Sequence, residues 1–348
     1  MSQTAFANIA TSLATLFEDR LTSQINRATV LLMLASVGAG PGKNITWGAR
    51  FGTAVGSAVA DGADVGSYNN DDKVPATLDY GTYHDTFSVT GKAMAAAANT
   101  RNPEELADLF GEELGDSSER LAKGISQALY TGTGATDHIM GLCDNTAGAI
   151  LDTGIYANIN RSTWPQWAAS IDSNGGVGRA LTFDLMRAMR TSIYNASGIK
   201  PDAIVTTPDI HGKFGSLFGT NRRYVQDIFI RGQKITLSGG YGALFFDDIP
   251  VIEDVDVPSG EMVFLNTRLM NIKQLPDPAQ AISQAMGTLN VAGTEEEQFG
   301  QPSGKIRARI NPLARTGDAF KFQIICYPQL QVRRPNAFGR IKDIDATL

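Results

Sequence analysis

Apolar residues recur at helical spacing in three stretches of the chain. Across residues 5–34 they follow steps of three and four, which predicts an amphipathic helix or a flexibly attached arm. A second stripe covers residues 103–130 after an Asn-Pro start, and at 1.5 Å per residue it predicts a helix about 42 Å long. The third lies between a Thr182 cap and Gly198. Each helix is predicted to bury one face.

Alternation of apolar and polar residues marks residues 45–51 and 83–89 as strands. Between them, residues 52–78 are rich in Gly, Ala, Ser, Asn and Asp and show no helical period. The pattern predicts a long hairpin with an irregular, acidic tip. A two-stranded hairpin is marginal in water on its own, and so long a loop is unusual inside a compact domain. We therefore expect the hairpin to lie on another subunit.

The sequence pattern changes near Ser170, where short apolar segments typical of strands begin to alternate with segments typical of helices. Strands are predicted at 203–205, 243–246, 250–252 and 262–265. Alternation returns after residue 276 and is clearest at 320–326, where a C-terminal strand is predicted to pair near the long helix. The fold class that follows is α+β.

Composition excludes several classes of protein. The 348 residues hold 30 Lys+Arg and 36 Asp+Glu, a net charge of −6, whereas a dedicated nucleic-acid binder usually carries a basic field. No run of eighteen apolar residues exists, so we expect no membrane span. The N-terminus lacks a secretory pattern, and Cys143 and Cys326 are predicted to be reduced thiols in a cytoplasmic protein.

Motifs that carry chemistry are missing from the sequence. Residues 38–44 fail the phosphate-loop pattern at two positions, and no nucleophile elbow occurs. His84, His138 and His211 lie in different segments, and the acidic residues at 61–72 lack the spacing of a calcium loop. We therefore expect no catalytic, cofactor-binding or metal-binding residues and no enzyme.

Several segments, in order, resemble the major capsid proteins of tailed bacteriophages, which share the Hong Kong phage-type capsid fold. Residues 47–52 are similar to the outgoing strand of the family's extended loop (E-loop), and residues 78–97 to the returning strand. Residues 129–134 resemble the end of its long spine helix, and residues 155–162, with Trp164 and Trp167, the crossing between its two domains. Further similar segments are 26–32, 201–208 and 262–269.

The resemblance implies a division of the chain into five parts along the sequence. These are an N-terminal arm (1–42), an extended loop hairpin (43–98), a peripheral domain with the spine helix (99–165), an axial domain (166–275), and peripheral strands with a C-terminal tail (276–348).

The function implied by the resemblance is that of a structural subunit of an icosahedral viral shell. The chain would assemble with itself into hexamers and pentamers that enclose the phage genome, double-stranded DNA held without sequence-specific binding. Further implied partners are a separate scaffolding protein, a portal protein and a decoration protein. The expected location is the capsid of the virion, after assembly in the host bacterial cytoplasm.

Contacts between subunits would then be the functional residues. Aromatic side chains are enriched at interface centres, although packing within one chain is the alternative for each, and arginines would pair with the acidic tip. A Lys–Asn cross-link is a further hypothesis, with Lys73 and either Asn311 or Asn336. The candidate contact residues are Trp47, Arg50, Phe51, Tyr68, Lys73, Tyr80, Tyr83, Phe87, Arg222, Arg223, Arg333 and Arg334.

Two other functions remain open from the residues alone. An encapsulin-like nanocompartment shell would use the same fold to enclose a cargo enzyme. A glycine-rich α+β hydrolase or binding module would use the hairpin as a lid, and it would require a pocket with convergent polar groups.

Overall fold

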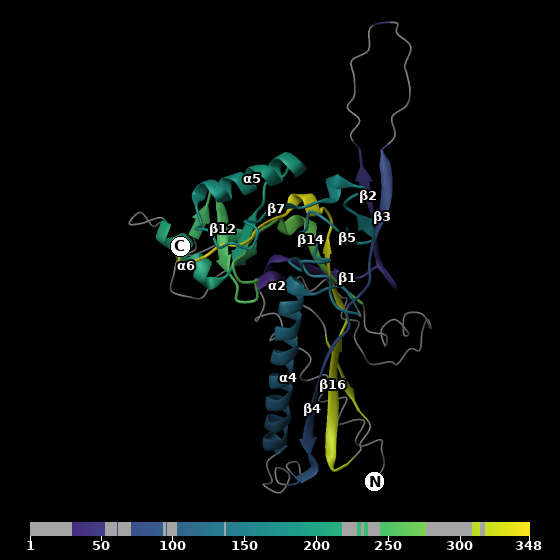
Figure 1. Cartoon of the computed structure of the whole chain (residues 1–348). Helices are drawn as coiled ribbons and strands as arrows, with labels where there is room; N and C mark the ends of the chain where they lie inside the picture. The colour runs from purple at the N-terminus through teal and green to yellow at the C-terminus, as the bar shows by residue number, and fades with distance from the viewer. Residues whose placement is uncertain are drawn as a thin grey trace.

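The computed structural model describes most of the chain (Figure 1). The described residues are 30–52, 61, 71–92, 95, 103–135, 137–217, 228–230, 233–235, 244–275, 308–313 and 317–348. Of the predicted helix at 5–34, only α2 (Val30–Leu34) falls within these ranges.

The long helix α4 (Pro103–Thr131) lies along a three-stranded sheet, as Figure 1 shows. The sheet has the order β15-β16-β4, made by Arg309–Pro312, Ala319–Cys326 and Tyr83–Thr90. Rings of Phe87, Phe110 and Phe322 meet between helix and sheet at centroid distances of 5.0–5.3 Å. The prediction that a C-terminal strand pairs near the long helix is confirmed.

The hairpin differs from its prediction. Its outgoing strand is β2 (Ile45–Phe51), but the returning strand is β3 (Asp72–Leu78), which lies in the stretch expected to be irregular. The prediction of a returning strand within residues 78–97 is therefore wrong, because β4 pairs with β16 instead. Pro75 and the charged start of β3 hid this strand, since Pro is depleted in strands but tolerated at sheet edges.

A six-stranded sheet forms the second part of the molecule. Its order is β11-β12-β8-β13-β18-β7. The strands are Leu244–Phe246, Ile249–Glu253, Ala203–Thr206, Met262–Leu265, Gly339–Ile341 and Ser170–Asp172. Two helices belong to it, α5 (Phe183–Ser197) and α6 (Pro208–Leu217).

The limits of α5 are set by local chemistry. The Thr182 side chain accepts a hydrogen bond from the Leu185 backbone N–H, and Gly198 ends the helix in the left-handed region at φ 72°. Both ends agree with the sequence prediction. Met186, Met189 and Ile193 are buried on its inner face.

A third sheet connects the two parts. It has the order β1-β14-β17, from Ser36–Ala39, Met270–Gln274 and Pro328–Val332. The remaining short elements are β5 (Ile155–Tyr156), β6 (Ile159–Asn160), β9 (Ile228–Ile230), β10 (Gln233–Ile235), and the 3-10 turns η1 (Pro165–Trp167), η2 (Thr267–Leu269) and η3 (Pro335–Ala337).

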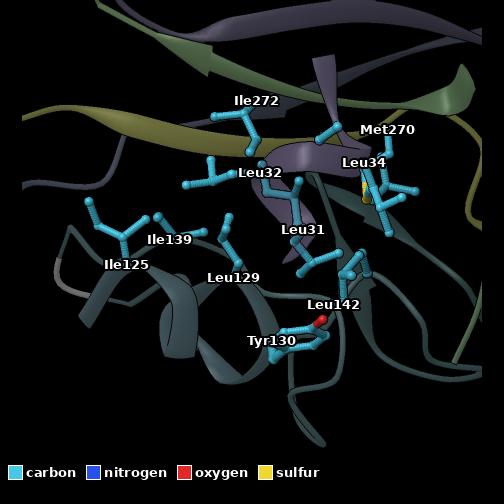
Figure 2. Packing of buried hydrophobic residues seen from close by; sticks show 14 of the residues in the cluster. Leu31, Leu32, Leu34, Ile125, Leu129, Tyr130, Ile139, Leu142, Met270 and Ile272 are labelled. Atoms are coloured by element: carbon cyan, nitrogen blue, oxygen red, sulfur yellow. The ribbon is translucent and has the colours of Figure 1, made fainter. Parts of the chain in front are cut away.

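The main hydrophobic core runs without interruption from α4 into the six-stranded sheet. Alternate residues of β8 and β13 belong to different clusters: Ile204 and Phe264 pack with α5 and α6, whereas Val205 and Val263 belong to the main core. Figure 2 shows the α2 leucines between the end of α4 and Met270 of β14. The two parts of the molecule therefore share one core, with no linker between them.

Strand β18 comes from residues 276–348, the segment expected to supply peripheral strands and a tail. It instead lies inside the six-stranded sheet, antiparallel to β13 and parallel to β7. Gly339 allows this because α5 approaches closely: an added Cβ would lie 2.6 Å from the Ile193 Cδ1 atom. Likewise β14, near the end of the expected axial segment, pairs with β1 and β17.

Candidate assembly surfaces

The paired part of the hairpin is attached to the body through its inner face. The Phe51 ring stacks on Trp164 at 4.7 Å between centroids and meets the edge of Trp167 at 5.7 Å. The Thr77 N–H donates to the Ala157 carbonyl at 2.9 Å. Figure 1 shows β2 and β3 beside β5, at one edge of the molecule. The base of the hairpin therefore has a fixed direction.

The outer face of the hairpin is exposed and carries two opposed cations. Arg50 and Lys73 face each other across the strands, an arrangement that is unfavourable for like charges. The Arg50 guanidinium pairs with Asp71 while its side chain stays 74% exposed. Among the described residues, Lys73 has no ion-pair partner. Both predicted contact residues are thus available on the surface.

Three other predicted aromatic contacts face into the chain. Phe51 and Phe87 are buried in the packing just described, and the Tyr80 ring is buried with its hydroxyl unpaired. Tyr83 is half-buried, and its hydroxyl accepts from the Ile139 N–H at 3.3 Å. Trp47 is half-buried with its Nε1–H unpaired. The alternative given for each aromatic residue, packing within its own chain, therefore describes Phe51, Phe87 and Tyr80.

The remaining predicted contacts lie elsewhere in the chain. Arg333 and Arg334 are exposed after β17, where the Arg334 Nη2 donates to the Ser197 carbonyl at 3.0 Å. They are far along the chain from the hairpin, and among the described residues Asp71 pairs with Arg50 instead. Tyr68, Arg222 and Arg223 lie outside the described residues.

Arg161 is buried directly after β6, beside the segment that contacts the hairpin. The sequence patterns did not identify it. Its Nη1 donates to the Thr153 carbonyl, and its Nη2 to the Gly148 and Ala149 carbonyls, at 2.9–3.0 Å. Burial lowers the pKa of the Arg161 guanidinium to about 10, so it remains charged at neutral pH. One cation therefore closes the loop that precedes β5.

The end of α4 is joined to the six-stranded sheet through two carboxylates, the buried Asp254 and the half-buried Asp256. The Tyr130 hydroxyl donates to the Asp254 carboxylate at 2.7 Å, and the Ser126 hydroxyl donates to Asp256. Both carboxylates lie in the connection from β12 to β13. Burial raises the pKa of Asp254 above its ordinary value, and it raises the pKa of Tyr130 well above its own.

A second connection comes from β18. Arg340 is fully buried and donates to the Cys143 carbonyl and, at 2.8 Å, to the Asn145 side chain. Its Nη1 lies 3.5 Å from the Glu261 carboxylate, whose pKa is raised by burial. The sequence signal for such a residue is a single charge inside an apolar strand, as in Phe338-Gly339-Arg340-Ile341.

The two cysteines are buried, and the three histidines lie on different segments, with His84 and His138 exposed. Cys143 and Cys326 are free and buried, which raises the pKa of each thiol to about 12. In the described ranges, no three His, Cys, Asp or Glu side chains are grouped as metal ligands. None of the described helices is both long and apolar enough to span a bilayer.

Comparison with models of known protein families identifies the family of this chain. The family model described as the SU10 major capsid protein matches residues 7–345, nearly the whole length. The chain belongs to the SU10 major capsid protein family. A comparison with curated proteins gave no match.

Solved structures similar to this capsid protein show the same fold. The capsid of cyanophage A-1(L) matches with a TM-score of 0.69 at 23% identity, covering 91% of this chain and 92% of the other. The capsid of an empty GTA particle gives 0.54 at 13% identity, covering 91% and 90%. The Hong Kong phage-type capsid fold predicted from the sequence is confirmed.

Membership of the family fixes the function at a coarse level. This capsid protein is a structural shell subunit of the virion that assembles with itself, and it is not an enzyme. The encapsulin complex of Synechococcus elongatus PCC 7942 is a more distant likeness, with a TM-score of 0.51 at 12% identity over 91% of this chain and 88% of the other. The hypothesis of a viral shell subunit is therefore favoured over that of a nanocompartment shell protein.

The buried carboxyls predict a pH dependence of stability for this capsid protein. Because the folded state raises the pKa of Asp254 and Glu261, it binds their protons more tightly than the unfolded chain does. Their contribution to stability is therefore greatest at low pH and falls as pH rises through the raised pKa values. Denaturant titrations between about pH 4 and pH 7 will show this.

Matched variants isolate that contribution from all other groups. In Asp254→Asn and Glu261→Gln the side chain no longer titrates, so the free energy of unfolding of the wild type, minus that of the variant, is expected to fall as pH rises. A difference that stays constant or rises with pH would contradict the prediction.

Proposed function

We propose that this chain forms hexamers and pentamers that close into an icosahedral shell around double-stranded DNA. The observation that carries the proposal is the hairpin of a capsid-family chain. Its inner face is tied to the body by Phe51, while its outer face presents Arg50 and Lys73. Such a hairpin suits a neighbouring subunit, on which the outer face of β2 and β3 would lie. Strand β4, also part of the expected 43–98 segment, packs on its own chain.

The five-part division of the chain is kept as a proposal, amended where strands pair across its boundaries. The peripheral part comprises α4 with β4, β15 and β16, and the axial part comprises the six-stranded sheet with α5 and α6. Strand β18 joins the axial part, and β14 joins the sheet between them. Because both parts share one core, we expect each subunit to enter the shell as a single body.

Partners other than the chain itself belong to the same proposal. They are a separate scaffolding protein, a portal protein and a decoration protein, with assembly in the host bacterial cytoplasm. Contact with DNA would be non-specific and carried by a few cations, because the chain has a net charge of −6. Binding of the free chain to DNA should therefore be weak, with a shallow dependence on salt because few counterions would be released.

Candidate contacts between subunits are the exposed members of the predicted set. Arg50 and Lys73 on the hairpin and Arg333 and Arg334 after β17 meet that condition. Each exposed ion pair contributes only about 0–1 kcal/mol, so many repeated contacts would hold the shell together.

Expression of the chain alone tests the proposal. Size-exclusion chromatography with negative-stain electron microscopy is expected to show closed shells, or hexameric and pentameric rings. A folded monomer at every concentration and salt condition, with a hairpin that resists protease, would contradict it. Denaturing gels also test the Lys73 cross-link, since covalent oligomers would form a ladder above the 37.2 kDa band.

A further inference from the structure

One end of the six-stranded sheet carries four exposed cations, here called the basic end: Lys200, Arg268, Arg333 and Arg334. Hydrogen bonds hold their segments together. The Arg333 N–H donates to the Leu269 carbonyl at 2.9 Å, and the Asn266 side chain donates to the Lys200 carbonyl at 3.3 Å. The four cations therefore come from three distant segments but lie at one corner.

No carboxylate of the described residues pairs with these four cations. The nearest acid in sequence, Asp202, is occupied by Thr267, which donates to it from both N–H and hydroxyl at 2.7–2.8 Å. The Lys200 ammonium lies over the Tyr194 ring at 5.9 Å, and Tyr194 is 48% exposed. Asp202 and the exposed Asp248 before β12 lie at this end as well, but the four cations outnumber these two carboxylates. The basic end thus combines a net positive charge with an exposed aromatic surface.

The opposite end of the same strands is acidic. The group called the acidic end consists of Asp209 in the first turn of α6, Glu253 at the end of β12, and Asp256. Val255 stands between the last two and is 82% exposed, the largest exposure of any large apolar side chain described. His211 lies 3.5 Å from Glu253, and burial lowers the pKa of this histidine, so it offsets little charge at neutral pH.

The two ends cannot meet within one chain. Strand β8 runs from Ala203, next to the basic end, to Thr206, whose carbonyl accepts from the Asp254 N–H. Strand β12 is parallel to it and, at about 3.3 Å per residue, spans about 16 Å. A rigid sheet therefore keeps the charges apart, and only another copy can bring them together.

We propose that the basic end of one subunit docks on the acidic end of the next, head to tail around a ring. Such a contact joins two different surfaces, so repeating it by rotation closes a ring, as a capsid subunit requires. In this contact the cations of the basic end face the carboxylates of the acidic end. The exposed side chain of Tyr194 on the basic end packs against that of Val255 on the acidic end. This inference rests on the proposed function and adds the surfaces through which neighbours in one ring meet.

Reversing the charge of one end at a time tests the contact. The basic-end variant carries Lys200→Glu, Arg268→Glu and Arg333→Glu, and it spares Arg334 because that side chain bonds to Ser197. The acidic-end variant carries Asp209→Lys and Glu253→Lys, and it spares Asp256 because Ser126 donates to it. Each alone is expected to need at least about tenfold more protein for half-assembly, measured by mass photometry.

Mixing the two variants gives the decisive result. In a head-to-tail ring of alternating copies, the reversed basic end meets the reversed acidic end at one contact and two unreversed ends meet at the next, so opposite charges face each other at every contact. The mixture is therefore expected to recover assembly in rings with an even number of subunits, and a chain carrying all five changes is expected to assemble by itself. A charge swap on the outer face of α5, Asp184→Arg with Arg187→Asp, serves as the control and should leave assembly unchanged.

Different failures have different meanings. If both variants assemble like the wild type, or if the folded variants stay apart when mixed, this contact is overturned while the shell function stands. Folded variants that stay apart when mixed would be expected if the basic end bound a polyanion such as DNA. If the wild type itself never assembles, the proposed function fails as well. Circular dichroism of each variant checks that it has folded.

Discussion

Replacing Arg161 with methionine is expected to lower the free energy of unfolding by about 3 kcal/mol or more. Methionine keeps the apolar stem of arginine but donates no hydrogen bonds. The buried carbonyls of Gly148 and Ala149 and the partly buried carbonyl of Thr153 therefore lose their partner. Each buried polar group left unpaired costs about 1–3 kcal/mol. Equilibrium denaturation in guanidinium, followed by tryptophan fluorescence, measures the change.

The hairpin should respond to the same substitution. Arg161 closes the loop that leads into β5 and the turn at Ala157, which bonds to β3. Loss of that closure is expected to increase proteolysis of the paired strands. Arg50→Met removes an equally long cation from an exposed position and is the matched control, with an expected change within about 0.5 kcal/mol. Similar losses in both variants would refute the role assigned to Arg161.

Two glycines near the same helix are expected to respond in opposite ways to alanine. A Cβ at Gly132 would lie 2.2 Å from the Ile139 carbonyl oxygen and 2.5 Å from that of Ala128. Both are backbone atoms, which cannot turn away as a side chain can. Gly132→Ala should therefore destabilise the protein by about 3 kcal/mol, at the upper end of the cost of overpacking.

Gly124 provides the contrast from the middle of α4. An added Cβ there meets nothing within 4 Å, and alanine is a better helix former than glycine. Gly124→Ala is expected to raise the free energy of unfolding by about 0.5–1 kcal/mol. Thermal unfolding of both variants checks the pair. A stable Gly132→Ala protein would mean that the turn after α4 can move apart from β4 and β16.

Features set by neighbouring residues were predictable from the sequence. The limits of α5 follow from Thr182 and Gly198, and the length of α4 follows from its apolar stripe. Strand β3 was not predictable, because Pro75 and Lys73 are poor strand residues and only pairing with β2 orders them. The place of β18 in the six-stranded sheet depends on contacts with β13 and β7, which lie far away in the sequence.

The candidate contacts show the same limit. Arg50 and Lys73 are exposed on the hairpin, although Lys73 lies in β3 and not near an irregular tip. Their contact with a neighbouring subunit stays a prediction. Whether an aromatic ring faces a neighbour or its own chain depends on tertiary packing, and the partners of Phe51 are more than a hundred residues away at Trp164 and Trp167. Alternation in a strand gives the face of a residue but not what covers that face.

The position of β18 has a consequence for synthesis on the ribosome. This strand fills the gap between β13 and β7, and Arg340 within it reaches the loop after α4. Until residues 339–341 have left the exit tunnel, a nascent chain has neither the completed six-stranded sheet nor the hydrogen bonds by which Arg340 joins it to Cys143 and Asn145 after α4. A subunit cut short before these residues would lack a finished core. Completion of the core therefore depends on one of the last strands to be synthesised.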